Sequence, residues 1–105
     1  MFFIIIEEIE KKINITIIKE KMITFSIDKT EKEIDNYAFA IHEALYFFEN
    51  CEVNVFTGNI FVTNTLNEWI DKVSQQHESW KKVVDKQTEK NIILKGFTAY
   101  KKILS

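Results

Sequence analysis

The chain contains few side chains that could do chemistry at neutral pH, and their spacing is unfavourable. Its 2 histidines are His42 and His77, and its 1 cysteine is Cys51. Neither histidine is followed by a second one four residues later, as helical zinc sites require, and a lone thiol cannot form a thiolate cluster. His42 also precedes Cys51 by roughly two and a half helical turns, too far for it to activate the thiol. We therefore expect no catalytic residue, no metal site and no cofactor.

Glycine is scarce and arginine is absent. The only glycines are Gly58 and Gly96, so a phosphate-binding loop, a dinucleotide fingerprint or a nucleophile elbow cannot be built. All 14 basic residues are lysines, which removes the planar guanidinium fork that binds phosphate and guanine through paired hydrogen bonds. The common kinds of nucleotide chemistry are therefore excluded. We interpret Cys51 as a small apolar residue at the end of a helix.

Negative charge is concentrated in the middle of the chain, although the net charge is only −2. No lysine occurs between Glu33 and Asp71, whereas seven acidic residues do: Glu33, Asp35, Glu43, Glu49, Glu52, Glu68 and Asp71. We expect this stretch to form an anionic surface that attracts a basic partner. The lysine-rich stretch Lys81–Lys102 is interspersed with acidic residues, so nucleic-acid binding through these lysines is a weaker alternative.

The hydrophobic pattern predicts the elements that carry these residues. Residues 1–6 form a continuous apolar run, and residues 13–17 and 23–27 alternate between apolar and polar types, as strands do. Charged segments at 7–12 and 19–21 would provide the turns of an antiparallel meander. No run is long enough for a transmembrane helix, and the first has no basic flank or cleavage site, so we expect neither a membrane span nor a secretory signal.

Helical spacing begins after the third strand. Thr30 and Glu33 have the spacing of a capping box, and apolar residues then recur at intervals of three or four, at Ile34, Ala38, Ile41, Leu45 and Phe48. This pattern predicts a helix of about five turns with one apolar stripe. Acidic and aromatic residues share a flank beside that stripe: Asp35, Phe39, His42, Glu43, Tyr46 and Glu49.

We interpret this flank as a candidate partner-binding face. Its aromatic rings could anchor a partner by burial, while its carboxylates pair with basic side chains and steer the approach. Asp35 and His42 lie two turns apart, about 10 Å along the axis, which is too far for an orienting hydrogen bond in a catalytic triad. The equally weighted structural alternative is that Phe39 and Tyr46 pack against a sheet edge or a terminus.

A β-hairpin is expected next. Gly58-Asn59 separates two apolar segments, and glycine tolerates the positive φ of a two-residue hairpin turn. In this register Val55 would face Val62 on one side of the sheet, and Phe56 would face Phe61 on the other. If helices cover only the valine side, Phe56 and Phe61 are open to a partner, and we include both among the candidate binding residues. If a helix covers them, they belong to the core.

A second long helix and a short strand complete the expected fold. Thr65 and Glu68 repeat the capping-box spacing, and an apolar stripe runs from Leu66 to Val84. Residues 92–94 resemble a strand, and the spacing of the last apolar residues fits either a helix or a strand: Phe97, Tyr100, Ile103 and Leu104. The order βββ-α-ββ-α-β predicts one α+β domain over residues 1–105, in which an antiparallel sheet of about five to six strands packs with two long helices.

The character of the sequence favours binding over catalysis. Small size, a lysine-free anionic stretch, a composition rich in lysine, isoleucine and asparagine, and the lack of catalytic motifs resemble in kind the immunity proteins that bacteria carry against their own secreted toxins. We expect a non-enzymatic cytoplasmic inhibitor that neutralises a basic protein such as a nuclease toxin, and the single cysteine fits a reducing compartment. The alternative is a small enzyme or ligand-binding domain that uses His42 or His77.

Overall fold

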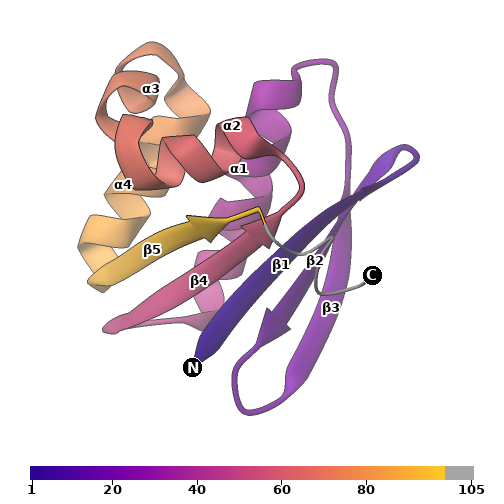
Figure 1. The fold of residues 1–105 in the computed structure, drawn as a ribbon, viewed down its shortest axis with the longest axis vertical. Coiled ribbons are helices and arrows are strands. Elements are labelled where there is room, and N and C mark those ends of the chain that lie inside the picture. The colour runs from indigo at the N-terminus through magenta and orange to yellow at the C-terminus, as the bar shows by residue number, and fades with distance from the viewer. Residues whose placement is uncertain (99–105) are drawn as a thin grey trace.

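A computed structural model describes residues 1–98 of the chain, which form one sheet with helices packed against it (Figure 1). The strands and helices are, in chain order, β1 (Phe2–Ile9), β2 (Lys12–Ile18), β3 (Met22–Asp28), α1 (Glu33–Ala44), β4 (Cys51–Thr57), α2 (Ile60–Asn64), α3 (Ile70–Gln76), α4 (Glu78–Lys90) and β5 (Ile92–Phe97). A 3₁₀ turn (Leu45–Phe47) follows α1, and a π-helical segment (Thr65–Trp69) joins α2 to α3.

The sheet has five strands in the order β3-β2-β1-β4-β5. Strands β1, β2 and β3 form the predicted antiparallel meander, whereas β4 pairs in parallel with both β1 and β5. The α+β class is therefore confirmed, but the expectation of a purely antiparallel sheet is wrong. Helical crossovers precede both β4 and β5, and such a crossover returns the chain to the same end of the sheet, so the next strand runs parallel.

The predicted hairpin across Gly58-Asn59 is wrong as well. Gly58 does not adopt a positive φ, so the primed turn is not made. Instead the Asn59 side chain caps α2 by accepting a hydrogen bond from the Val62 amide at 3.2 Å. A capping side chain satisfies an otherwise free amide of the first helical turn, and this local bond competes successfully with strand pairing. Phe61 therefore lies on a helix and does not face Phe56.

The first predicted helix is confirmed, but it starts later and ends earlier than expected, because its last predicted turn is the 3₁₀ turn at Leu45–Phe47. Thr30 does not cap it; the buried side chain of Asn36 accepts from the Thr30 amide at 2.8 Å, and helix α1 begins at Glu33 without a side-chain cap. The second predicted helix is interrupted, because His77 is extended (φ −132°, ψ 117°) and separates α3 from α4. Phe97 ends strand β5, and the other three residues of the uncertain C-terminal piece, Tyr100, Ile103 and Leu104, lie outside the described residues.

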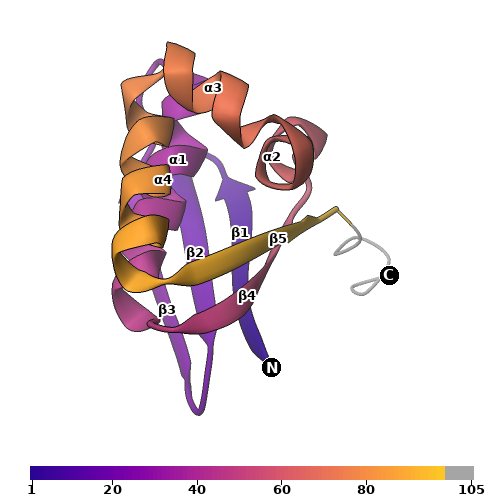
Figure 2. The same ribbon diagram turned by 90° about the vertical axis from the view of Figure 1, so that its left-hand side faces the viewer.

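The core lies between the sheet and the helices, with α1 and α4 on the same side (Figure 2). The predicted stripe supplies Ala38 and Ile41 from α1, Leu45 from the 3₁₀ turn and Phe48 directly after it, and each of them is almost fully buried. Facing them are the inward residues of the strands, among them Ile4, Ile6, Ile13, Ile15, Ile17, Val53 and Val55. Trp80 of α4 is completely buried, and its indole N–H donates to the Ile34 carbonyl at 3.1 Å, which ties α4 to the first turn of α1.

Candidate binding site

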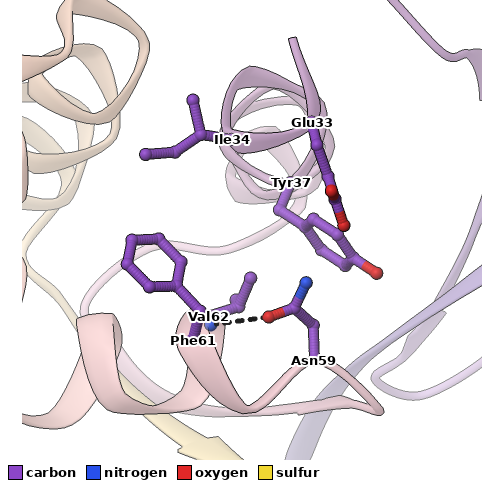
Figure 3. Close-up of a pocket in the computed structure, with 6 residues that line it drawn as sticks. All are labelled: Glu33, Ile34, Tyr37, Asn59, Phe61 and Val62. Carbon is purple, nitrogen blue, oxygen red and sulfur yellow. Dashed lines mark hydrogen bonds between the residues drawn. The ribbon is translucent and has the colours of Figure 1, made fainter.

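Strands β1 and β4 are parallel neighbours, so their carboxyl ends lie side by side at the same end of the strands. At this end of the sheet, β1 is followed by a turn into β2, whereas β4 is followed by helix α2. A cavity of about 330 Å³ opens there, which we call the α1–α2 crevice; it is lined by Glu33, Ile34, Tyr37, Asn59, Phe61 and Val62 (Figure 3).

Local structure fixes both walls of the α1–α2 crevice. The Asn59 cap sets the start of α2, so that Val62 is buried while the neighbouring Phe61 ring stays 38% exposed. On α1, Ile34 and Tyr37 are one turn apart and share a face. Figure 3 shows the Phe61 ring across the opening from Tyr37 and Asn59. Both helices contribute to each side of the crevice. One wall is apolar and consists of Ile34, Phe61 and Val62, and the other carries the polar atoms of Glu33, Tyr37 and Asn59.

A hydrogen-bonded pair behind the polar wall holds Tyr37 in place. The Tyr37 hydroxyl donates to the Glu8 carboxylate, which also forms an ion pair with Lys29 at 2.8 Å. The hydrogen bond from Lys29, followed by that from Tyr37, lowers the pKa of Glu8 below its ordinary value of 4.5. Burial, reinforced by the Glu8 carboxylate, raises the pKa of Tyr37. Both groups thus keep one protonation state near neutral pH, which suits a positioning role better than proton transfer.

Replacing Tyr37 with phenylalanine is expected to lower the free energy of unfolding at pH 7 by about 1–2 kcal/mol, because a partly buried hydrogen bond to a charged group is lost. The pKa of Glu8 should rise at the same time. A carboxyl group whose pKa is lowered by folding stabilises the fold above its unfolded pKa, and this contribution is lost as the pH falls through the folded pKa. The difference between wild type and Y37F in urea unfolding should therefore shrink between about pH 5 and pH 3. A difference that stays constant over that range would contradict the proposed pairing.

A second hollow lies next to the crevice, on the other side of Ile34. This α1–α4 groove has a volume of about 410 Å³ and is lined by Lys32, Ile34, Asp35, Phe39, Gln76, His77, Glu78, Ser79 and Lys82. Its charges are mixed, since two lysines stand among its acidic residues. Glu33, by contrast, is the one charged residue among those that line the α1–α2 crevice, and it is exposed. The charge at the crevice is therefore negative only, whereas the groove carries charges of both signs.

The structure brings together only some of the residues predicted to bind a partner. Asp35 and Phe39 line the α1–α4 groove, and Phe61 lines the adjoining crevice. The Asp35 carboxylate, however, accepts from the Ser79 hydroxyl at 2.6 Å, so it is already engaged. Phe56 lies on the opposite face of the sheet, where it stacks on Phe97 with ring centroids 5.1 Å apart. Its predicted place beside Phe61 is wrong, because the intervening hairpin does not form.

The remaining predicted residues lie toward the C-terminal end of α1. Glu43 and Glu49 are exposed, and His42 contacts Tyr46 edge-on, with ring centroids 5.7 Å apart. Two lysines of α4 lie over the exposed Tyr46 ring, with Nζ of Lys86 at 5.1 Å and Nζ of Lys90 at 5.8 Å from its centroid. Positive charge from α4 therefore interrupts the expected anionic surface at Tyr46. The lysine-free stretch and the lysine-rich helix are far apart in the sequence, but α1 and α4 pack side by side in the fold.

Of the residues that line the crevice, the sequence predicts only Phe61 as a binding residue. It places Glu33 in the anionic stretch but not on the binding face, and it assigns no site role to Ile34, Tyr37, Asn59 or Val62. Ile34 and Tyr37 carry the periodicity of a core stripe, and the partner of Tyr37, Glu8, is 29 residues away in the sequence. No local pattern could have revealed that pairing. Asn59 did carry a signal, since an asparagine followed by an apolar segment is typical of a helix N-cap as well as of a turn.

The histidines do not assemble a recognisable catalytic group. His77 lines the α1–α4 groove with Asp35 and Ser79, but the Ser79 hydroxyl donates to the carboxylate and not to a histidine base. Within residues 1–98, no group of three or more histidine, cysteine or acidic side chains is arranged to hold a metal ion. The same part of the chain contains no helix with the length and apolar character needed to cross a membrane.

Comparisons with known proteins give no further guide to function. No protein-family model matches this chain, and no curated protein matches it in sequence at a significant level. Function therefore has to be inferred from the geometry of the crevice and its surroundings.

Proposed function

We propose that this protein is a non-enzymatic inhibitor that binds a basic protein, such as a nuclease toxin, through the α1–α2 crevice and the adjoining surface of α1. The observation that carries the proposal is the exposed Glu33 carboxylate at a crevice whose other wall presents the Phe61 ring. A cytoplasmic location, in which the inhibitor would meet a toxin before its release, belongs to the same proposal.

The crevice suits a lysine or arginine side chain of the partner. The aliphatic stem of such a side chain can lie along Ile34 and Val62, while its charged end reaches Glu33. A cation near the face of Phe61 gains a further attraction to the aromatic ring. Exposed aromatic rings next to a pocket are also the usual anchors of protein interfaces, and Phe39 and Phe61 are 40% and 38% exposed.

The surrounding charges support a basic partner that approaches from the Glu33 end of α1. The exposed Glu33 carboxylate would attract a positively charged protein, whereas Lys86 and Lys90 near Tyr46, and Lys32 and Lys82 in the adjoining groove, would repel it. This narrows the binding face expected from the sequence to the N-terminal half of α1, the crevice and α2.

A small cationic ligand is the second candidate for the same crevice. Its volume of about 330 Å³ falls at the lower end of the range for ligand pockets. The two candidates differ in the molecule that fills the crevice. An inhibitor would bind a folded basic protein there, whereas a ligand-binding domain would bind a free amine.

Co-expression with the product of the neighbouring gene tests the proposal. The tagged protein should purify in a one-to-one complex with that product and abolish its toxic activity when added in equal amount. Glu33→Lys should weaken the complex about tenfold or more, since an attraction at a desolvated anchor becomes a repulsion. Binding is measured by calorimetry and neutralisation by the activity of the partner.

Glu20→Lys is the matched control, because it makes the same charge change at an exposed position between β2 and β3, away from the crevice. The control should bind like wild type. Equal weakening by both variants would mean that only net charge matters, and full neutralisation by E33K would mean that the partner does not use the crevice.

A further inference from the structure

The two edge strands of the sheet, β5 and β3, differ in whether their outward backbone groups form hydrogen bonds with side chains. At the β5 edge, the Asn67 side chain accepts from the Gly96 amide at 2.8 Å and donates to the Gly96 carbonyl at 2.9 Å. The Gln87 side chain donates to the Ile92 carbonyl of the same strand at 3.4 Å. Free backbone groups on an edge strand attract other strands, and side chains that occupy them prevent such pairing. Side chains therefore occupy backbone groups near both ends of β5.

Within residues 1–98, no side chain protects the β3 edge in this way. The Lys29 amide donates to the Lys11 carbonyl of the β2 side at 2.9 Å, so odd-numbered residues of β3 point their backbone groups toward β2. The even-numbered residues, including Thr24 and Ser26, therefore point theirs outward. Within the described part of the chain, no hydrogen bond reaches these outward groups. Residues 22–27 contain no charge and no proline, and their pairing with β2 is continuous, without a bulge.

The side chains at this edge are also incompletely covered. On the side that faces the helices, Ile23 is 40% exposed, and Phe25 and Ile27 are half-buried. The Phe25 ring lies 6.0 Å from that of Phe47, which is itself 36% exposed. Exposed apolar side chains and unpaired backbone groups thus coincide on one strand, a combination that favours association with another strand.

From these features we infer that β3 pairs antiparallel with β3 of a second copy of this chain, about a two-fold axis at Phe25. In this register Ile23 lies opposite Ile27, and Thr24 lies opposite Ser26, so apolar residues meet apolar residues and small polar ones meet each other. The same residue pairs occur twice, as an isologous interface requires. The two sheets then become continuous.

Other registers fit less well. A side chain keeps its face of the sheet only if the pairing shifts by two residues. A shift in one direction places Lys21 opposite Ile27, and a shift in the other places Ile23 opposite Lys29. Either shift buries a charge against an apolar partner, so the sequence of β3 selects the register centred on Phe25.

The oligomeric state and the exchange of two amides test this inference. Sedimentation velocity from about 5 to 500 µM should show a concentration-dependent change from the 12.5 kDa chain to a species of twice that mass. Hydrogen exchange should show the Thr24 and Ser26 amides protected at high concentration and unprotected on dilution, because a second strand would engage outward N–H groups that have no partner within residues 1–98. A mass of one chain at every concentration would overturn the inference.

Ser26→Pro removes one outward N–H and leaves the bonds to β2 intact, so it should raise the dimer dissociation constant about tenfold or more. Ser26→Ala keeps that N–H and serves as the control at the same position; it should dimerise like wild type. A dimer that S26P leaves unchanged would place the interface elsewhere and overturn the inference. If S26P does not fold, amide exchange of the wild type decides alone.

Discussion

Replacing Trp80 with alanine is expected to lower the free energy of unfolding by about 3–5 kcal/mol, the largest stability effect of any substitution considered for this fold. The side chain is completely buried between α4 and α1, so its removal leaves a cavity as well as losing apolar burial. The Ile34 carbonyl also loses its hydrogen bond to the indole N–H. Urea unfolding followed by circular dichroism measures the change.

Trp69→Ala is the matched control, because this tryptophan is the last residue of the π-helical segment and is 39% exposed. Its loss should cost less than about 1 kcal/mol, as is usual for partly exposed positions. Because W80A could unfold a domain of ordinary stability, Trp80→Phe provides a milder variant, which should still be less stable than W69A. Equal effects at both tryptophans would contradict the central position of Trp80 in the core.

The role of Trp80 connects stability to the proposed function. Ile34, whose carbonyl accepts the indole hydrogen bond, separates the α1–α2 crevice from the α1–α4 groove. The packing of α4 therefore positions the N-terminal half of α1, which carries the Glu33 carboxylate. A binding defect in W80A would reflect displacement of this surface, whereas a defect in E33K would reflect the reversal of charge at one position.

Patterns within a single element were enough to predict most of the fold. A continuous apolar run predicted β1, and the alternation of apolar and polar residues predicted β2 and β3 of the meander. The stripe from Ile34 to Phe48 predicted α1 and its buried face. The parallel pairing of β4 could not be predicted in this way, because it depends on where a crossover returns the chain.

The error at Gly58-Asn59 shows why local patterns failed at the site. The dipeptide is compatible with a hairpin turn and with a helix cap, and only the packing of the following segment against β5 decides between them. The wall formed by α2 was therefore missed, and with it most of the crevice. Phe61 was selected for a pairing with Phe56 that does not exist, although its exposure beside the crevice keeps it in the candidate site.

The close approach of α2 to β5 gives the second large prediction. A Cβ atom at Gly96 would lie 3.0 Å from both the Cα and the carbonyl oxygen of Thr63, closer than unstrained atoms pack. These are backbone atoms of α2 and cannot move aside as a flexible side chain could. Gly96→Ala should therefore lower the free energy of unfolding by about 1–3 kcal/mol, the usual cost of overpacking. It should also weaken the two hydrogen bonds between Gly96 and Asn67.

Gly58→Ala is the natural control, since Gly58 is exposed and its φ is not positive. An alanine there should leave stability unchanged or raise it by up to about 1 kcal/mol, because the unfolded chain loses freedom. Chemical denaturation of the two variants measures both effects, and amide chemical shifts should move at Thr63 and Val62 in G96A alone. If G96A were as stable as wild type, α2 would not rest on β5 at this distance, and the position of the Phe61 wall of the crevice would need revision.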